Sequence, residues 1–229
     1  MITTIVFDLD DTLYDEIDYC RSGFEAVAKA LASLPGIAAD AEAAIFNTFW
    51  QEFMSGNRGK TFNVALEKLG LPSSQDTVER LVMLYRVHKP VITLPPSSKA
   101  VLDTLSIKYT LALLTDGYLP AQELKVAALG IKKYFKFIVY TEAMGRQFWK
   151  PSPVGYQGIL AALNVEPENC VYVGDNEIKD FIAPNQLGFT TIRIIRPNGI
   201  HKEHGTDPNA PASHTITDLA DLPKLLKSL

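Results

Sequence analysis

The chain has 229 residues, of which 47% are hydrophobic and 21% are charged, and it carries a net charge of −4. These values predict a globular protein with one large domain, or a core domain with a smaller insert, and they argue against nucleic acid or an anionic membrane as its partner. The two cysteines, Cys20 and Cys170, are too few for a disulfide framework, so we expect a cytoplasmic protein.

The chain begins with a short apolar segment that is predicted to be a strand. Residues 2–9 are rich in β-branched and aromatic side chains and lack the positive charges that open a signal peptide. Similar apolar runs recur at 110–114, 137–140, 170–173 and 191–195. Runs that are apolar on both faces are typical of a parallel sheet covered by helices. All of them are too short to span a bilayer.

Helical patterns separate these runs. We expect helices at 119–129, 154–163 and 180–187, with Gly130 and Gly188 ending the first and the third. A loop over 197–213 precedes a last short strand at 214–216 and a helix at 219–226. The alternation of strands and helices predicts an α/β fold with a doubly wound parallel sheet.

Residues 15–93 interrupt this alternation. Apolar side chains at 24, 27, 28 and 31 have the spacing of an amphipathic helix. Further helical patterns at 41–53, 61–69 and 77–88 are separated by turns that contain Gly or Pro. We therefore predict an all-helical cap over 15–93, inserted into a core made of 1–14 and 94–229.

The first candidate site is the acidic run from Asp8 to Thr12, at the end of the first strand. Open parallel sheets bind ligands at the carboxyl ends of their strands. In an extended segment Asp8 and Asp10 project to the same side, and two close carboxylates favour a hard divalent cation such as Mg²⁺. Asp and Thr also cap helices well, so this run alone leaves both interpretations open.

Three more polar groups follow predicted strands or loops of the core. Thr115 and Asp116 precede a glycine and can present a hydroxyl and turn amides to a phosphate. Lys150 can neutralise a phosphate, and Asp175 can add a carboxylate to a metal site, with Asp180 in support. Each group alone also fits a helix cap or a solvated surface. Their conjunction at one edge of one sheet predicts a phosphate and metal site.

The whole set resembles the haloacid-dehalogenase-like hydrolase superfamily. That family combines Asp-x-Asp-x-Thr, a strand-end Ser or Thr, a Lys often followed by Pro, and Gly-Asp-x-x-x-x-Asp, and this sequence contains all four. The resemblance covers nearly the whole chain and implies a Rossmann-like core with a small helical cap. The chain departs from the family in a slightly longer segment at 145–150 and in Asp116, where Asn is frequent.

The resemblance implies a Mg²⁺-dependent phosphohydrolase of a small phosphorylated metabolite, such as a sugar phosphate, a nucleotide or phosphoglycolate. Asp8 is similar to the nucleophile that forms an aspartyl-phosphate, and Asp10 to the general acid and later base. The implied phosphate-binding residues are Thr115, Asp116 and Lys150. The implied metal ligands are Asp8, Asp175 and the backbone carbonyl of Asp10, with Asp180 and Thr12 in supporting roles.

Other activities stay open at this point. Asp10 argues for phosphate esters over haloacids, because a halide leaves without a proton. A sugar phosphomutase of the same family shares the chemistry and differs in its product. A phospho-accepting signalling module uses a similar acidic pair, Thr and Lys, but such modules are shorter and have no helical cap.

Substrate identity is not readable from the sequence. Within the cap, Asn57, Arg58 and Lys60 lie beside two glycines and are candidates for contacts with the substrate. An ordinary turn between two helices explains the same residues. We expect a small phosphorylated molecule as the partner, and a monomer or a homodimer.

Overall fold

The structure is a computed structural model that describes residues 1–38, 40–56, 58–201 and 203–229. The chain divides into two compact units. The first consists of Met1–Ile17 and Thr93–Leu229, and the second of Asp18–Ile92. The domain boundaries expected after residues 14 and 93 stay a prediction.

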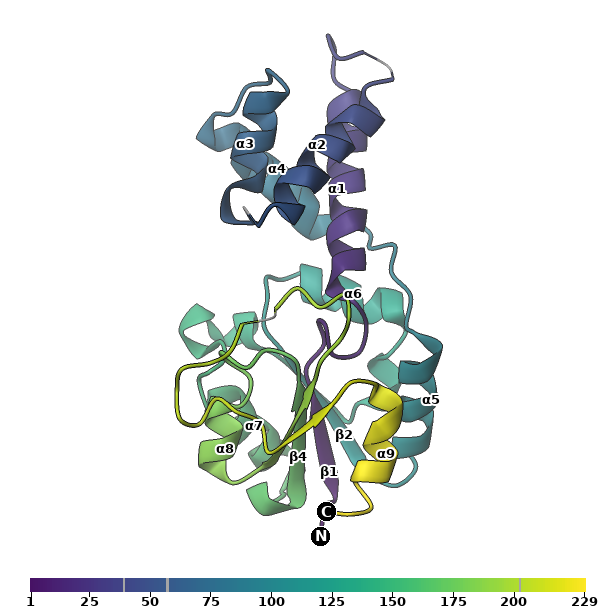
Figure 1. The fold of residues 1–229 in the computed structure, drawn as a ribbon, viewed down its shortest axis with the longest axis vertical. Helices are drawn as coiled ribbons and strands as arrows, with labels where there is room; N and C mark the ends of the chain where they lie inside the picture. The colour runs from purple at the N-terminus through teal and green to yellow at the C-terminus, as the bar shows by residue number, and fades with distance from the viewer. Residues whose placement is uncertain (39, 57, 202) are drawn as a thin grey trace. The chain divides into compact units, whose positions relative to one another are not determined.

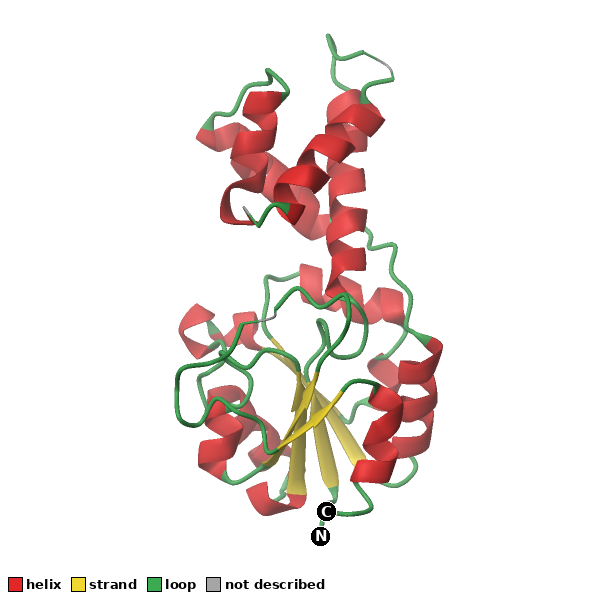
Figure 2. Cartoon of the chain, viewed as in Figure 1, coloured by secondary structure: helices red, strands yellow, loops and turns green. Residues whose placement is uncertain are grey.

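The first unit is built on a parallel sheet, which contains six strands among the described residues (Figures 1 and 2). The strands are β1 (Thr4–Phe7), β2 (Thr110–Thr115), β3 (Phe137–Tyr140), β4 (Cys170–Gly174), β5 (Thr190–Ile194) and β6 (His214–Ile216). Their order is β3-β2-β1-β4-β5-β6. The order reverses at β1, which creates the crevice where α/β sheets of this kind bind ligands.

The register of the three central strands determines which residues meet at that crevice. Phe7 of β1 is aligned with Leu113 of β2 and with Val173 of β4. The residues that follow these three positions therefore leave the sheet at the same edge. All of β1 and β4 is buried, as their continuous apolar sequences predict.

Helices cover both faces of the sheet. Their bounds are α5 (Pro96–Leu105), α6 (Ala121–Leu129), α7 (Val154–Leu163), α8 (Ile182–Leu187) and α9 (Leu222–Leu225), with short 3₁₀ turns at Lys132–Tyr134, Thr141–Met144, Arg146–Phe148, Pro167–Asn169 and Leu219–Asp221. Helices α5 and α9 lie on one side, and α7 and α8 on the other (Figure 1). On the α7 and α8 side, Tyr156, Tyr172 and Phe181 belong to one buried cluster. The predicted doubly wound α/β fold is confirmed.

Two details of the core differ from the predictions. Helix α5 was not expected, although Pro96 stands at its first position, where its fixed φ suits a helix start. The helix expected at 219–226 is divided into a 3₁₀ turn and α9. Pro223, in the first turn of α9, has no N–H to continue a helix from residue 219. The predicted ends of α6 and α8 are confirmed, since Gly130 and Gly188 adopt left-handed conformations with φ of 65° and 98°.

The second unit is helical. It contains most of α1 (Glu16–Ala32), α2 (Glu42–Met54), a 3₁₀ turn (Arg58–Lys60), α3 (Thr61–Lys68) and α4 (Gln75–Val87). Phe24 is at its centre and stacks on Phe49 with ring centroids 6.0 Å apart. Rings of Phe53, Phe62 and Tyr85 surround Phe24. Apolar side chains of α1 thus meet those of the other helices, which the spacing at 24–31 predicted. Among the described residues, no helix is both long enough and apolar enough to cross a membrane.

Candidate active site

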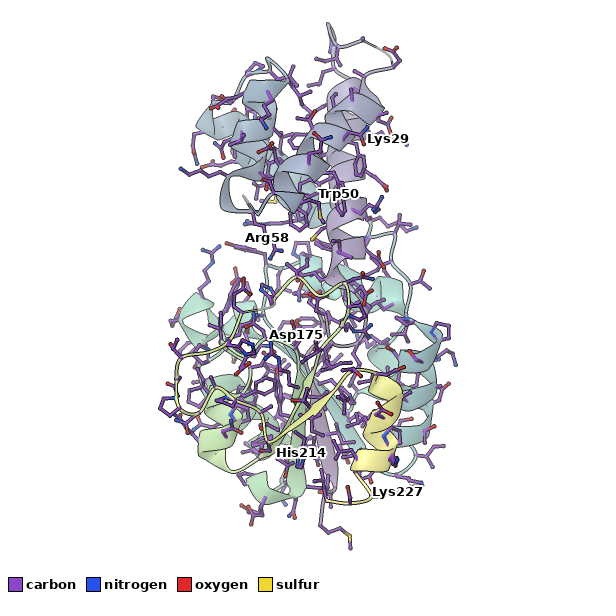
Figure 3. The ribbon with its side chains drawn as sticks, in the orientation of Figure 1. Lys29, Trp50, Arg58, Asp175, His214 and Lys227 are labelled. Carbon is purple, nitrogen blue, oxygen red and sulfur yellow. The ribbon has the colours of Figure 1, made fainter. Side chains whose placement is uncertain are left out.

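Asp8 leaves the sheet directly after β1 and is buried. Its backbone N–H donates to the carbonyl of Val173 at 2.8 Å, which continues the pairing of β1 with β4 by one residue. Asp175 follows β4 and is also buried. Figure 3 shows Asp175 at the end of the sheet where the strands finish, and Lys227 at the opposite end. The parallel register therefore brings two predicted site residues to the same place from positions 167 residues apart in the chain.

Lys150 is a buried cation between two carboxylates. Its Nζ donates to Asp8 Oδ1 at 2.7 Å, to Asp180 Oδ1 at 2.7 Å and to the hydroxyl of Tyr172 at 3.1 Å. Burial lowers the pKa of Lys150, but Asp180 and Asp8 outweigh it and keep that pKa well above its ordinary value. The lysine therefore stays charged and stabilises the ionised forms of its partners.

The loop that carries Lys150 is attached to the loop after β2. Both carboxylate oxygens of Asp116 lie 3.2 Å from the backbone nitrogen of Lys150, which donates to them. The hydroxyl of Thr141 donates to Asp116 Oδ1 at 2.8 Å. Asp116 thus orients the backbone at Lys150. Both of its carboxylate oxygens accept hydrogen bonds, which gives a physical reason for an aspartate at a position where the family frequently has Asn.

Removing the Lys150 charge is expected to destabilise the protein strongly. In Lys150→Met, Asp8 and Asp180 lose their buried counter-charge, and an uncompensated buried charge costs about 3–5 kcal/mol. Urea unfolding at neutral pH measures this loss. Lys99→Met is a matched control, because Lys99 forms an exposed pair with Asp103. A loss as small as that of the control would show that the Lys150 pairs contribute little to stability.

Asp8, Asp175 and Asp180 form a buried acidic cluster. One carboxylate oxygen from each residue lies within 4.8 Å of the others. Burial raises the pKa of Asp8 to about 7, against the effect of Lys150. Burial and the neighbouring carboxylates Asp180 and Asp8 raise the pKa of Asp175 well above its ordinary value. Oδ2 of Asp175 is buried and has no hydrogen-bond partner among the described residues.

These features fit a hard divalent cation. Such an ion binds carboxylate oxygens. A buried carboxylate oxygen without a hydrogen-bond partner needs an explanation, and a bound cation supplies one. Asp180 differs from the other two acids, because Lys150 and Lys179 outweigh its burial and lower its pKa. One of its oxygens accepts from Lys150 and the other from the backbone N–H groups of Asp175 and Asn176. Asp180 therefore serves to orient the loop and the lysine.

Gly174 makes room for this arrangement. A Cβ at Gly174 would lie 2.6 Å from Oδ2 of Asp180, which is closer than real Cβ atoms come. The glycine in Gly-Asp-x-x-x-x-Asp is thus required because the second acid turns back against the strand end.

The Asp10 carboxylate lies outside the acidic cluster. It accepts hydrogen bonds from the hydroxyl of Tyr14 at 2.5 Å, from Nε2 of Gln122 at 2.8 Å and from Nζ of Lys125 at 2.8 Å on both oxygens. Burial would raise the pKa of Asp10, but Lys125 outweighs it and holds that pKa below its ordinary value. The expected role of the Asp10 backbone carbonyl as a metal ligand stays a prediction.

Thr115 and Thr12 have different surroundings. The Thr115 hydroxyl is buried at the end of β2 and accepts from Nε2 of Gln122 at 2.6 Å. The Thr12 hydroxyl is buried without a partner among the described residues, while its carbonyl accepts from Arg196. Their predicted roles in phosphate binding and support stay predictions.

Several residues that contact predicted site residues were missed from the sequence, among them Tyr14, Thr141, Tyr172, Lys179, Gln122 and Lys125. Lys179 lies inside the fourth motif, and its Nζ is 3.5 Å from Asp116 Oδ2. Gln122 and Lys125 share one face of α6, and a polar pair at this spacing normally marks the solvent side of a helix. Here both side chains are buried. The local sequence contained no signal for that burial.

The cap residues expected to contact substrate belong to the second unit. Arg58 and Lys60 are exposed in the 3₁₀ turn before α3 (Figure 3 labels Arg58). The Arg58 guanidinium carbon lies 5.4 Å from the ring centre of Phe53. Asn57 lies outside the described residues. Contacts of these side chains with a substrate stay a prediction.

Comparisons with known proteins agree with the fold. The model of the haloacid dehalogenase-like hydrolase family matches residues 2–188. The chain therefore belongs to the haloacid dehalogenase-like hydrolases. The predicted family, and with it the class of a hydrolytic enzyme, is confirmed.

Curated relatives are similar over their full lengths. A glyceraldehyde 3-phosphate phosphatase of Methanocaldococcus jannaschii is 28% identical over 233 residues, covering 100% of this chain and 99% of that protein. The human N-acylneuraminate-9-phosphatase is 26% identical over 243 residues, covering 100% and 95%.

Solved structures share the fold. A 2-haloacid dehalogenase from Pseudomonas syringae has a TM-score of 0.66 at 24% identity and covers 100% of this chain and 99% of its own. A HAD-hydrolase from Bacillus subtilis bound to magnesium has a TM-score of 0.70 at 19% identity, with 98% of each chain covered.

Proposed function

We propose that this protein is a phosphoric monoester hydrolase that acts on a small phosphorylated metabolite through Asp8. The observation that carries this proposal is the buried Lys150, 2.7 Å from both Asp8 and Asp180, two members of the acidic cluster that also contains Asp175. Relatives named as phosphatases of glyceraldehyde 3-phosphate, N-acylneuraminate 9-phosphate and ribulose 1,5-bisphosphate favour a sugar phosphate as the substrate.

In the first step, a carboxylate oxygen of Asp8 attacks phosphorus and the bond from phosphorus to the ester oxygen breaks. The leaving alcohol takes a proton from the protonated form of Asp10, which is the minor form in the free protein because Lys125 lowers the pKa of Asp10, so the products are an alcohol and an aspartyl-phosphate. Lys150, held against Asp8, offsets the negative charge of the nucleophile and of the incoming phosphoryl group.

In the second step, water attacks the phosphorus of the aspartyl-phosphate. Asp10 accepts a proton from that water, and the acyl–phosphate bond breaks. Asp8 is regenerated and inorganic phosphate is released. Proton transfer by a positioned group typically contributes about 10²–10⁴ in rate. Asp10 thus acts in both steps, which distinguishes this proposal from dehalogenation.

Asp8, Asp175 and the backbone carbonyl of Asp10 would hold Mg²⁺ in this proposal. When bound, the cation stabilises negative charge on the phosphoryl oxygens. Thr115 and Lys150 would bind the phosphoryl group, and so would the backbone N–H groups next to Asp116. The Asp116 carboxylate itself already accepts hydrogen bonds from Lys150 and Thr141.

Substrate choice would depend on the cap, with Arg58, Lys60 and Asn57 as candidates. The basic side chains among them suit a second anionic or hydroxyl-rich group on the substrate. A monomer and a homodimer are both compatible with this proposal.

A panel assay tests the proposed function. The purified protein with Mg²⁺ is expected to release inorganic phosphate from p-nitrophenyl phosphate and, more efficiently, from at least one sugar phosphate, nucleotide or phosphoglycolate. Free phosphate without an isomerised sugar phosphate distinguishes a phosphatase from a phosphomutase. No release from any member of the panel would contradict the proposal.

A further inference from the structure

Both oxygens of the Asp10 carboxylate accept hydrogen bonds from side chains that the family motifs do not include. Tyr14 and Lys125 bind Oδ1, while Gln122 and Lys125 bind Oδ2, all between 2.5 and 2.8 Å. Gln122 and Lys125 come from α6, more than 110 residues away in the chain. Two separate segments of the core therefore converge on this one carboxylate.

Gln122 also connects Asp10 to the predicted phosphate pocket. Its Nε2 donates to Thr115 Oγ1 at 2.6 Å and to Asp10 Oδ2 at 2.8 Å. One nitrogen atom of Gln122 thus donates to an oxygen of Asp10 and to the hydroxyl oxygen of Thr115. This contact holds the Asp10 carboxylate next to the hydroxyl at the end of β2.

The backbone at Gly117 makes space for this amide. Gly117 has φ of 137°, and a Cβ there would lie 2.8 Å from Cδ of Gln122 and 3.0 Å from its Oε1. A side chain at residue 117 would displace Gln122 from both partners. The glycine after Thr115-Asp116 is therefore coupled to the position of Asp10.

Lys125 supplies the charge in this cluster. Its side chain is 4% exposed, and its Nζ also lies 3.7 Å from Oε1 of Glu16. Among the described residues, the charged and titratable groups around Lys125 include Asp10, Glu16 and Tyr14. His201 lies 4.0 Å from the other oxygen of Glu16, and Asp11 raises the pKa of Glu16 electrostatically. A buried lysine beside two acids is stable only in a fixed geometry, so it restricts the Asp10 side chain.

We infer that Gln122 and Lys125 are positioning residues that hold the Asp10 carboxylate where it exchanges a proton with the leaving group. This inference rests on the proposed function. It extends that function to two residues of α6, which act through Asp10 and do not themselves touch the substrate. Tyr14 contributes the third contact from the segment that carries Asp10.

Two substrates with different leaving groups separate this role from general damage. Nitrophenolate leaves without a proton, whereas the alkoxide of an alkyl or sugar phosphate needs one. Lys125→Met is expected to lower kcat/KM for a sugar phosphate by about 100-fold, the order of loss that misplacing a catalytic group causes, and to change kcat/KM for p-nitrophenyl phosphate by less than about 3-fold. Gln122→Met, which changes no charge, is expected to show the same selectivity at about 10-fold. kcat/KM reports only the steps up to departure of the leaving group, so the role of Asp10 in the second step does not enter this comparison.

The ratio of kcat/KM for the sugar phosphate to kcat/KM for p-nitrophenyl phosphate is independent of the folded fraction, because inactive protein lowers both values equally. Lys99→Met, on the exposed face of α5, is the matched control and should keep the wild-type ratio. In the Asp10→Asn background, Lys125→Met should cause no further loss on the sugar phosphate. If Lys125→Met does not fold, Gln122→Met still tests the inference.

The outcomes distinguish the two levels of the proposal. A wild-type protein that hydrolyses neither substrate contradicts the proposed function. A wild-type protein that hydrolyses both, with an unchanged or increased ratio in the two variants, contradicts only the role of Gln122 and Lys125. If the activity loss of Lys125→Met adds to the loss of Asp10→Asn in the double variant, the role of Lys125 is also contradicted, because the effect then does not depend on Asp10.

Discussion

Phosphatase turnover is expected to fall by at least about 10⁴-fold in Asp8→Asn, because an amide cannot replace the carboxylate as the nucleophile. The side chain of Asn has nearly the volume of Asp, and Lys150 keeps its contact with Asp180. The variant is therefore expected to fold, which a wild-type circular dichroism spectrum checks. Initial rates with saturating substrate and Mg²⁺ measure the loss.

Asp103→Asn is the matched control for that experiment. Asp103 makes an exposed ion pair with Lys99 and a hydrogen bond with Tyr134, away from the acidic cluster. Its turnover should equal that of the wild type. Wild-type turnover in Asp8→Asn would show that another group attacks phosphorus, and the covalent mechanism proposed for Asp8 would be wrong. Trapping of a labelled phosphoryl group on wild-type protein, absent in Asp8→Asn, supplies an independent measurement.

The second large effect concerns the acidic cluster. Excess Mg²⁺ is expected to raise the thermal unfolding midpoint of the wild-type protein, because a cation that binds only the folded state stabilises it. At about 100 times Kd the gain is about 2.7 kcal/mol, which corresponds to a rise of roughly 5–10 °C for a chain of this length. Chelation should reverse the rise and abolish phosphate release.

Asp175→Asn tests which residues bind the cation. This change replaces the Asp175 carboxylate, which contains the orphaned oxygen, by an uncharged amide of nearly the same shape. We therefore expect most of the Mg²⁺-dependent rise in the unfolding midpoint to disappear. Asp103→Asn should keep the full rise. An equal rise in Asp175→Asn would place the cation elsewhere. The midpoint is measured without substrate, so the result does not depend on whether the protein hydrolyses any member of the panel.

Most of the core was predictable because its signals are local. Apolar runs of four to eight residues marked the strands, and the expected strand at 137–140 agrees with β3 residue for residue. The glycines after α6 and α8 marked helix ends, since a left-handed residue is cheapest as glycine. Helix α5 was missed, although proline suits the first helical turn and Pro96 begins this helix.

The candidate site was predictable where the sheet itself places a residue. Asp8 and Asp175 each follow a buried strand, and the two strands are neighbours in the sheet. Lys150 could be proposed only in conjunction with the other polar groups, because a lysine in a loop has no local feature that distinguishes a buried cation from a solvated one. Its contacts with Asp8 and Asp180 require the loop geometry that Asp116 maintains.

The sequence by itself determined the alternation of strands and helices, the helical insert, and the order in which acids, hydroxyl and lysine follow the strands. Those features depend on residues close together in the chain, where periodicity and turn chemistry operate. Only the tertiary structure decided that Gln122 and Lys125 turn inward to Asp10, and that Asp180 rather than Asp10 completes the acidic cluster. The burial of a polar side chain is determined by what packs against it, and here those neighbours come from segments more than 100 residues away.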